Sequence, residues 1–121
     1  MATILLVEDE DSIRELVNLR LSMHGHDVSE AVNGRDGIEK ALALKPDLIL
    51  LDMHMPIMSG HEAARYLREN DYDGLIIALT ASAMVRETNR ARDSGCDGVI
   101  TKPITEEFED QVAALLEERG L

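Results

Sequence analysis

Aromatic residues are scarce in this chain, which has one phenylalanine, two tyrosines and no tryptophan among its 121 residues. A protein-bound flavin normally stacks on aromatic side chains, so this scarcity disfavours a flavin-binding electron carrier. Cysteine is nearly absent as well, because Cys96 is the single one. It can form no intramolecular disulfide, which favours a reducing compartment, and we expect a cytoplasmic protein.

Positive charge is also in short supply. Twelve Lys and Arg residues face 24 Asp and Glu residues, and the formal net charge is −12. Binding to nucleic acid or to an anionic membrane surface needs a basic patch, so neither partner is expected. No apolar run approaches the ~18 residues of a membrane span, and no signal peptide is evident. We expect one domain, which occupies residues 1–121.

Apolar segments alternate with amphipathic segments along the whole chain. Short, mostly apolar runs predict five strands, at residues 3–7, 27–31, 48–51, 75–79 and 99–100. Apolar residues at helical spacing predict five helices, at about residues 12–24, 38–44, 60–70, 83–94 and from about 105 onward. Such alternation implies a parallel sheet with helices on both faces, joined by right-handed crossovers. The predicted fold class is therefore α/β, a three-layer doubly wound domain.

Local signals mark several helix ends. Ser12 followed three residues later by Glu15 matches a capping box, and Gly25 is expected to end that helix. Gly95 is the expected stop of the fourth helix. The last helix is expected to start near Thr105, because two glutamates follow it and suit a first helical turn.

Polar side chains stand where the predicted strands end. Glu8 and Asp9 follow the first strand, Asp52 the third, Thr80 the fourth and Lys102 the fifth. The carboxyl ends of parallel strands meet at one edge of a sheet, which is where ligands bind in such folds. We therefore expect these five side chains to lie together.

Their combined chemistry points to phosphoryl transfer. Three carboxylates repel one another unless a cation lies between them, and Mg2+ accepts a few carboxylates while leaving room for phosphate oxygens. A carboxylate such as Asp52 can attack phosphorus and form an aspartyl phosphate. Lys102 and Thr80 would then supply the positive charge and the hydroxyl donor that stabilise a transferring phosphoryl group.

Motifs throughout the chain resemble those of one known family, the receiver domain of bacterial response regulators in two-component signalling. The matching segments are ILLVED at 4–9, DLILLDMHMP at 47–56, Gly60, LTA at 79–81 and KPI at 102–104. The resemblance implies a flavodoxin-like five-stranded parallel sheet of order 2-1-3-4-5 with five helices. In that order the first and third strands are neighbours, which brings Asp9 beside Asp52.

The resemblance also implies a role for each site residue. Asp52 matches the phosphorylated aspartate, Asp9 a direct Mg2+ ligand, and Glu8 an acid that reaches the metal through water. The backbone carbonyl of His54 matches the remaining protein ligand. Thr80 and Lys102 match the groups that contact the phosphoryl group, and Lys102–Pro103 matches a peptide bond that is typically cis. One residue departs from the family pattern: the family often has an aromatic residue where this chain has Val99.

The implied function is that of a phosphoacceptor regulator and not of an enzyme with a separate substrate. A histidine kinase or histidine phosphotransfer protein would donate the phosphoryl group, and a downstream effector protein would read the change around the fourth helix, fifth strand and fifth helix. The chain would be either a free-standing regulator or a receiver excised from a larger protein. Residues 83–94 have few apolar positions, so we expect this helix to be the element that responds to phosphorylation.

Other classes of function stay open at this point. A haloacid-dehalogenase-type phosphatase also uses an Asp after a strand, but it needs a second Asp two residues later, where this chain has His54. A protein-interaction module independent of phosphorylation could share the fold. His54 and His61 could form a metal-binding imidazole pair, although a carbonyl role for His54 and a helix-start role for His61 are preferred. The methionines at 53, 55 and 58 favour loop packing over a copper site, since no cysteine accompanies them.

Overall fold

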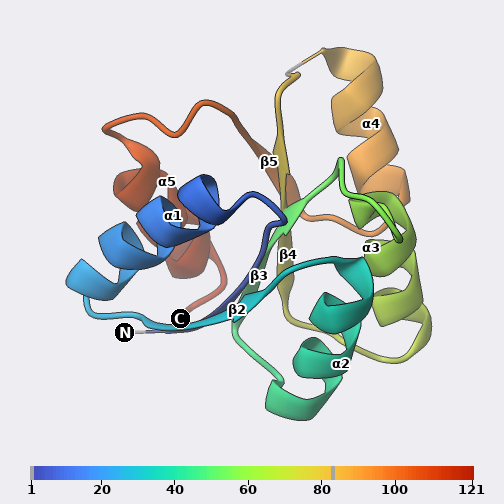
Figure 1. Ribbon diagram of the computed structural model, residues 1–121, viewed down its shortest axis with the longest axis horizontal. Coiled ribbons are helices and arrows are strands. Elements are labelled where there is room, and N and C mark those ends of the chain that lie inside the picture. The colour runs from blue at the N-terminus through green and yellow to red at the C-terminus, as the bar shows by residue number, and fades with distance from the viewer. Residues whose placement is uncertain (1, 83) are drawn as a thin grey trace.

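The computed structural model describes residues 2–82 and 84–121 and contains one five-stranded parallel sheet (Figure 1). The strands are β1 Thr3–Val7, β2 Asp27–Ala31, β3 Leu48–Asp52, β4 Leu75–Thr80 and β5 Gly98–Thr101. Their order in the sheet is β2-β1-β3-β4-β5, and every neighbouring pair is parallel. The predicted α/β doubly wound fold and its strand order are thus confirmed.

The register of the sheet sets the geometry of its carboxyl edge. Val7 of β1 pairs with Leu51 of β3, so the residues that follow these two positions leave the sheet side by side. Thr80 of β4 pairs with Thr101 of β5, which places Lys102 next to the end of β4. All of the predicted site residues therefore emerge at one edge.

Helices cover both faces of the sheet (Figure 1). Their bounds are α1 Asp11–Met23, α2 Gly34–Leu44, α3 Gly60–Glu69, α4 Val85–Asp93 and α5 Phe108–Glu118. Helices α1 and α5 lie on one face, and α2, α3 and α4 lie on the other. None of these helices is long and apolar enough to cross a membrane.

Successive strand residues point to opposite faces, so the sheet has two apolar cores. Leu5, Val7, Ile49 and Leu51 face the core under α2, α3 and α4. The core under α1 and α5 is built from the alternate strand positions and is closed by Phe108, which is fully buried. Because both faces are covered, strands β1, β3 and β4 are almost continuously apolar, as the sequence indicated.

The start of α1 differs from the sequence prediction. The helix begins at Asp11, its N-cap is Glu10, and no side chain caps it, so the capping box predicted at Ser12 and Glu15 is wrong. Ser12 already lies inside the first turn, where its backbone is helical. Leu16, which follows the apolar spacing of this helix, is 46% exposed.

A capping box does form, but at α3. The Ser59 side chain accepts a hydrogen bond from the Glu62 backbone N–H, and the Glu62 side chain accepts one from the Ser59 backbone. This reciprocal pair fixes the entry to α3 directly after the site loop. The apolar spacing predicted this helix, but the cap was not among the predicted features.

Two further helix starts also need comment. The last helix begins at Phe108 and not near Thr105, because the Phe108 N–H bonds to the Thr105 carbonyl in a preceding turn and its ring is anchored in the core. The predicted start of the fourth helix at residue 83 lies outside the described residues, and α4 is described from Val85.

Candidate functional site

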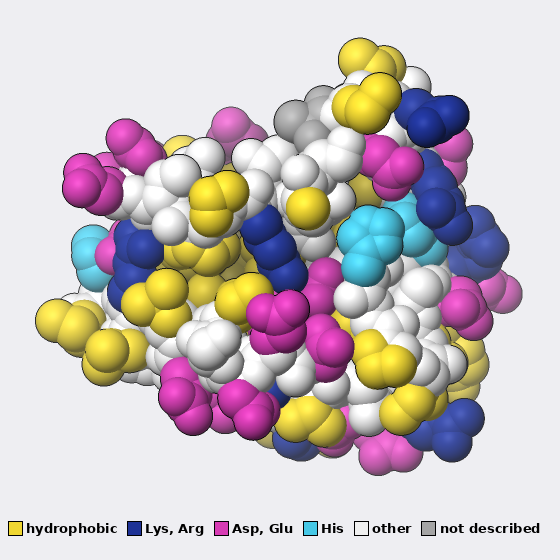
Figure 2. All heavy atoms as spheres, turned by 45° about the horizontal axis from the view of Figure 1, so that its top comes forward, with side chains coloured by type: hydrophobic (Ala, Val, Ile, Leu, Met, Phe, Trp, Pro, Cys, Tyr) yellow, Lys and Arg dark blue, Asp and Glu magenta, His cyan; other side chains and the backbone are white. Residues whose placement is uncertain are grey.

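The carboxyl edge of the sheet carries a cluster of acidic side chains. Figure 2 turns this edge toward the viewer and shows acidic groups gathered near the middle of the face, with a basic side chain beside them. The acids come from the end of β1 and the end of β3, which are neighbouring strands. Their proximity therefore follows from the topology of the sheet.

Three carboxylates of this cluster meet closely. Ligand oxygens from Glu8, Asp9 and Asp52 all lie within 4.8 Å of one another. Glu8 is fully buried and Asp52 is 4% exposed. Carboxylates so close and so poorly hydrated are costly unless cations compensate them. The predicted grouping of these three residues is present in the structure.

Lys102 supplies one compensating charge. Its Nζ lies 2.8 Å from Glu8 Oε1 and 3.4 Å from Asp52 Oδ2. Burial lowers the pKa of this ammonium, but the Glu8 and Asp52 carboxylates outweigh burial, and the pKa ends above its ordinary value. Lys102 is therefore a permanent cation at the acidic cluster. The peptide bond from Lys102 to Pro103 is cis, as the family resemblance implied.

Thr80 and His54 line the same edge through different groups. Thr80 is 4% exposed, and its Oγ1 accepts a hydrogen bond from the Ser82 backbone N–H at 3.3 Å. The His54 backbone N–H donates to Asp52 Oδ1 at 3.0 Å, while the His54 residue is exposed. A main-chain N–H thus binds the Asp52 carboxylate, and the Thr80 hydroxyl stands at the end of the neighbouring strand β4.

Gly60 allows the main chain to approach Asp52 closely. A Cβ at this position would lie 2.4 Å from the Asp52 carbonyl oxygen and 2.7 Å from the Met53 Cα. These contacts are with backbone atoms, which cannot swing aside. The Gly60 N–H also bonds to the Met53 carbonyl at 3.3 Å. A side chain here would displace the segment that carries Asp52.

His61 is a helix-start residue, as the sequence predicted, but its burial and its contact with α4 were not expected. It is the second residue of α3 but is only 6% exposed, and its Nδ1 lies 3.1 Å from Ser94 Oγ next to the end of α4. Among the described residues, the group with metal-binding geometry contains only the three carboxylates, so neither His54 nor His61 belongs to it. Met53 is buried and Met55 and Met58 pack against the core, which confirms the loop-packing interpretation.

One residue near the site was missed by sequence analysis. Arg14 of α1 donates to the Glu8 carbonyl at 2.9 Å and also bonds to the Asp11 carboxylate. A single basic residue one turn into a helix, three residues after the last of four successive acids, is the signal that could have identified it.

The residues present suit a hard divalent cation. The donor set consists of carboxylate oxygens only, which is the ligand type that Mg2+ prefers. Glu8 Oε1 is buried and accepts no hydrogen bond of good geometry from the described residues, so its contact with Lys102 is an ion pair. A carboxylate oxygen held by one cation keeps a lone pair for a ligand or its water.

Fold and site together define a class: doubly wound α/β domains with an acidic, lysine-bearing site at the carboxyl edge of the sheet. Comparison with known proteins narrows this class. Residues 4–113 match the family described as response regulator receiver domain. The chain belongs to this family.

Curated relatives agree with the family match. The chain is 39% identical over 119 residues to the DNA-binding dual master transcriptional regulator RpaA of Synechocystis sp., a match that covers 96% of this chain and 49% of RpaA. It is 41% identical over 116 residues to the nitrate/nitrite response regulator protein NarL of Escherichia coli, covering 94% of this chain and 53% of NarL. The chain thus spans about half the length of the curated relatives it matches.

Solved structures agree as well. The response regulator protein TrrA of Thermotoga maritima, in complex with Mg(2+)-BeF, superposes with a TM-score of 0.83 at 34% identity, covering 95% of this chain and 99% of TrrA. The chemotaxis response regulator CheY4 of Vibrio cholerae superposes with a TM-score of 0.89 at 29% identity, covering 96% of this chain and 98% of CheY4.

Proposed function

We propose that this receiver domain accepts a phosphoryl group on Asp52. The observation that carries the proposal is the arrangement of three carboxylates within 4.8 Å of one another with the Lys102 ammonium 3.4 Å from Asp52 Oδ2. An Asp52 oxygen attacks phosphorus, and the bond from phosphorus to the donor's histidine nitrogen breaks. The histidine nitrogen leaves with the bonding electron pair, and Asp52 becomes an acyl phosphate.

The surrounding residues receive roles that follow from their chemistry and from the family resemblance. Asp9 and Asp52 would hold Mg2+ directly, Glu8 through a water, and His54 through its backbone carbonyl. When bound, this ion supplies positive charge that offsets the negative charge of the phosphoryl oxygens. Lys102 stays protonated and contacts one phosphoryl oxygen, because its pKa is raised beside two carboxylates. The Thr80 hydroxyl donates a hydrogen bond to another oxygen.

The proposed partners follow from this reaction. The donor is the phosphohistidine of a histidine kinase or a histidine phosphotransfer protein, and the receiver of the signal is a downstream effector protein. The surface around α4, β5 and α5 would carry the change. Acidic residues dominate α5, so a basic or apolar protein surface suits it better than duplex DNA. A cytoplasmic location, favoured by the single free Cys96, stays a prediction.

The activity proposed is limited to the domain's own modification. The chain would catalyse its phosphorylation and the slow hydrolysis of its acyl phosphate, with no separate substrate. The competing proposal, an interaction module that works without phosphorylation, gives no reason for three clustered carboxylates, two of them buried, beside a lysine. Binding of Mg2+ at millimolar concentration separates the two proposals.

Phosphorylation by a small donor tests the function directly. Incubation with acetyl phosphate and Mg2+ should give an adduct that is stable in acid and labile in base, and chelation of Mg2+ should prevent it. Asp52→Asn should abolish the adduct. Asp71→Asn is a matched control, since Asp71 lies in the α3–β4 connection at the opposite edge of the sheet. Unchanged labelling of the Asp52→Asn variant would refute the assignment.

A further inference from the structure

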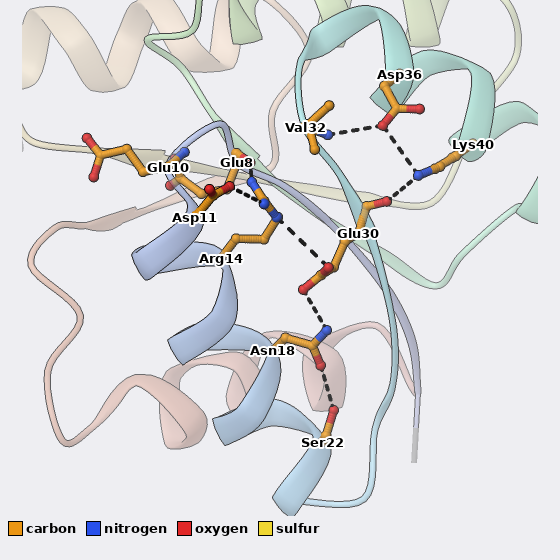
Figure 3. Close-up of polar contacts among 10 residues, drawn as sticks. All are labelled: Glu8, Glu10, Asp11, Arg14, Asn18, Ser22, Glu30, Val32, Asp36 and Lys40. Carbon is orange, nitrogen blue, oxygen red and sulfur yellow. Dashed lines mark hydrogen bonds and ion pairs between the residues drawn. The ribbon is translucent and has the colours of Figure 1, made fainter.

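Arg14 connects three parts of the structure beside the acidic site. Its Nη1 donates to the Glu8 carbonyl at the end of β1 at 2.9 Å, and its Nη2 bonds to Asp11 in the first turn of α1. Its Nε lies 3.9 Å from Glu30 Oε1 on β2. Figure 3 shows the guanidinium between these groups, and the side chain is only 12% exposed.

The partners of Arg14 are themselves held in place. Glu30 accepts a hydrogen bond from Asn18 Nδ2 at 2.8 Å, and its backbone carbonyl accepts one from Lys40 Nζ at 2.6 Å (Figure 3). Asn18 in turn accepts a bond from Ser22. A guanidinium that contacts several fixed partners holds its donors in one orientation, because the group is planar and rigid.

The contact with the Glu8 carbonyl has a consequence for Asp9. The peptide unit between Glu8 and Asp9 is planar, so the direction of its carbonyl determines the direction in which the chain enters Asp9. Two further hydrogen bonds hold this turn: the Glu8 N–H donates to Ala31 O of β2, and the Glu10 N–H donates to Glu8 Oε2 at 3.2 Å. Among the described residues, Arg14 is the side chain that donates to the carbonyl of this peptide.

We infer that Arg14 is a positioning residue of the cation site, which orients the Glu8–Asp9 peptide so that the Asp9 carboxylate joins Glu8 and Asp52. The inference rests on the proposed function, because it concerns how well Mg2+ is bound. Arg14 is not a ligand, since a guanidinium offers donors only. It acts through the main chain of the residue beside the ligand.

The charge of Arg14 gives the test a clear sign. The positive charge of Arg14 repels Mg2+ at the nearby acidic cluster. If charge alone mattered, removing Arg14 should therefore tighten Mg2+ binding. Loss of the positioning contact should instead weaken binding, because groups that orient metal ligands affect affinity strongly. The two effects predict opposite directions for the same substitution.

The experiment is a calorimetric titration of the metal-free protein with Mg2+ at fixed ionic strength. Arg14→Met is expected to raise the Kd about 10-fold, in the range found when groups behind metal ligands are removed. Arg14→Lys keeps the charge but not the planar fork, so it should recover only part of the affinity. In the amide NMR spectrum of Arg14→Lys, the Asp9 signal should move more than signals on β3.

Arg20→Met is the matched control. Arg20 lies on the same helix, donates to the Thr105 carbonyl at 2.6 Å and pairs with the Glu109 carboxylate, yet it faces α5 and not the acidic site. It therefore reproduces the loss of a bridging arginine without touching the β1–α1 turn. Its Kd for Mg2+ should stay at the wild-type value.

Specific results would overturn the inference. Binding of Mg2+ by Arg14→Met that is equal to or tighter than wild type would show that charge alone acts there. An equal loss in Arg20→Met would show a general effect of instability. If Arg14→Met does not fold, wild-type affinity in Arg14→Lys would have the same meaning. Absence of Mg2+ binding by the wild-type protein would instead refute the proposed function.

Discussion

The imidazole of His61 and the hydroxyl of Ser94 form a buried contact between α3 and the end of α4, with Nδ1 and Oγ 3.1 Å apart. Ser94 Oγ also donates to the Arg90 carbonyl at 2.9 Å. Nearby, Arg68 of α3 donates to the Gly95 carbonyl at 2.9 Å. The C-terminal end of α4 is thus attached to α3 at two positions.

The opposite end of α4 is held far less firmly. Its N-cap residue Met84 makes no side-chain hydrogen bond, and Met84 and Val85 are 63% and 74% exposed. Ala91 is the buried residue of the helix. A segment with little buried area opens at low free energy, so we expect α4 to be the element that a change at Thr80 displaces.

Hydrogen exchange should show this response. With a beryllofluoride phosphoryl mimic bound, we expect the largest change in exchange between residues 80 and 95, and a larger change in the first turn of α4 than in its last. Ser94→Ala should reduce that difference between the two ends. A strong response of β5 around Val99 with an unchanged α4 would contradict this prediction.

The buried His61 should also make stability depend on pH. Burial lowers the pKa of His61 below its ordinary 6.5, and the charge of Arg90 acts in the same direction against the smaller effect of Glu87. As pH falls through the ordinary value, the unfolded chain takes up a proton that the folded chain resists, so stability falls. Measured by thermal unfolding, the His61→Gln variant should lose less stability than wild type as the pH falls from about 7.5 to about 5.5. This window spans the ordinary pKa of histidine.

This comparison isolates one histidine. His26 also has a pKa lowered mainly by burial, but it is present in both proteins and cancels in the difference. Parallel stability curves for the two proteins across this pH range would show that His61 does not titrate as expected.

The lifetime of the acyl phosphate should depend on the residues two positions after Asp52 and Thr80. Neither His54 nor Ser82 offers a carboxylate to orient an attacking water, but an exposed neutral imidazole can do so. His54→Ala should therefore lengthen the half-life of the phosphorylated protein, and substitutions at Ser82 should change it while the fold stays intact. His24→Ala, at the exposed end of α1, is the control. Equal half-lives across several variants at both positions would refute the prediction.

Replacement of Gly60 should damage the site through the backbone. In Gly60→Ala the new Cβ would meet the Asp52 carbonyl oxygen at 2.4 Å, so the end of β3 must move. We expect a loss of roughly 1–3 kcal/mol in unfolding free energy. Phosphorylation by acetyl phosphate should slow by about 10-fold or more, because small displacements of reacting groups are costly.

Gly98→Ala provides the control for this substitution. Its added Cβ would meet ordinary van der Waals contacts, at 3.4 Å from Ile77 Cδ1 and 4.0 Å from Leu115 Cδ2. It should phosphorylate at the wild-type rate. A Gly60→Ala variant with wild-type stability and rate would show that β3 tolerates the displacement.

The fold class and the grouping of polar residues at one edge of the sheet could be predicted from the sequence. Apolar runs such as 48–51 have no polar alternation, which is typical of strands covered on both faces, and polar residues stand where these runs end. Because the strands are parallel, their carboxyl ends share one edge, so Asp52, Thr80 and Lys102 could be grouped before any contact was known.

The exact helix boundaries and the contacts that support the site depend on the tertiary structure. Local sequence allowed a cap at Ser12 and a helix start at Thr105, but the β1–α1 turn and the burial of Phe108 selected other positions. Arg14 of α1 contacts the Glu8 carbonyl at the end of β1. His61 of α3 contacts Ser94 at the end of α4. Such contacts depend on how the elements pack against one another. Local periodicity carries no information about that packing, so these contacts form only in the folded chain.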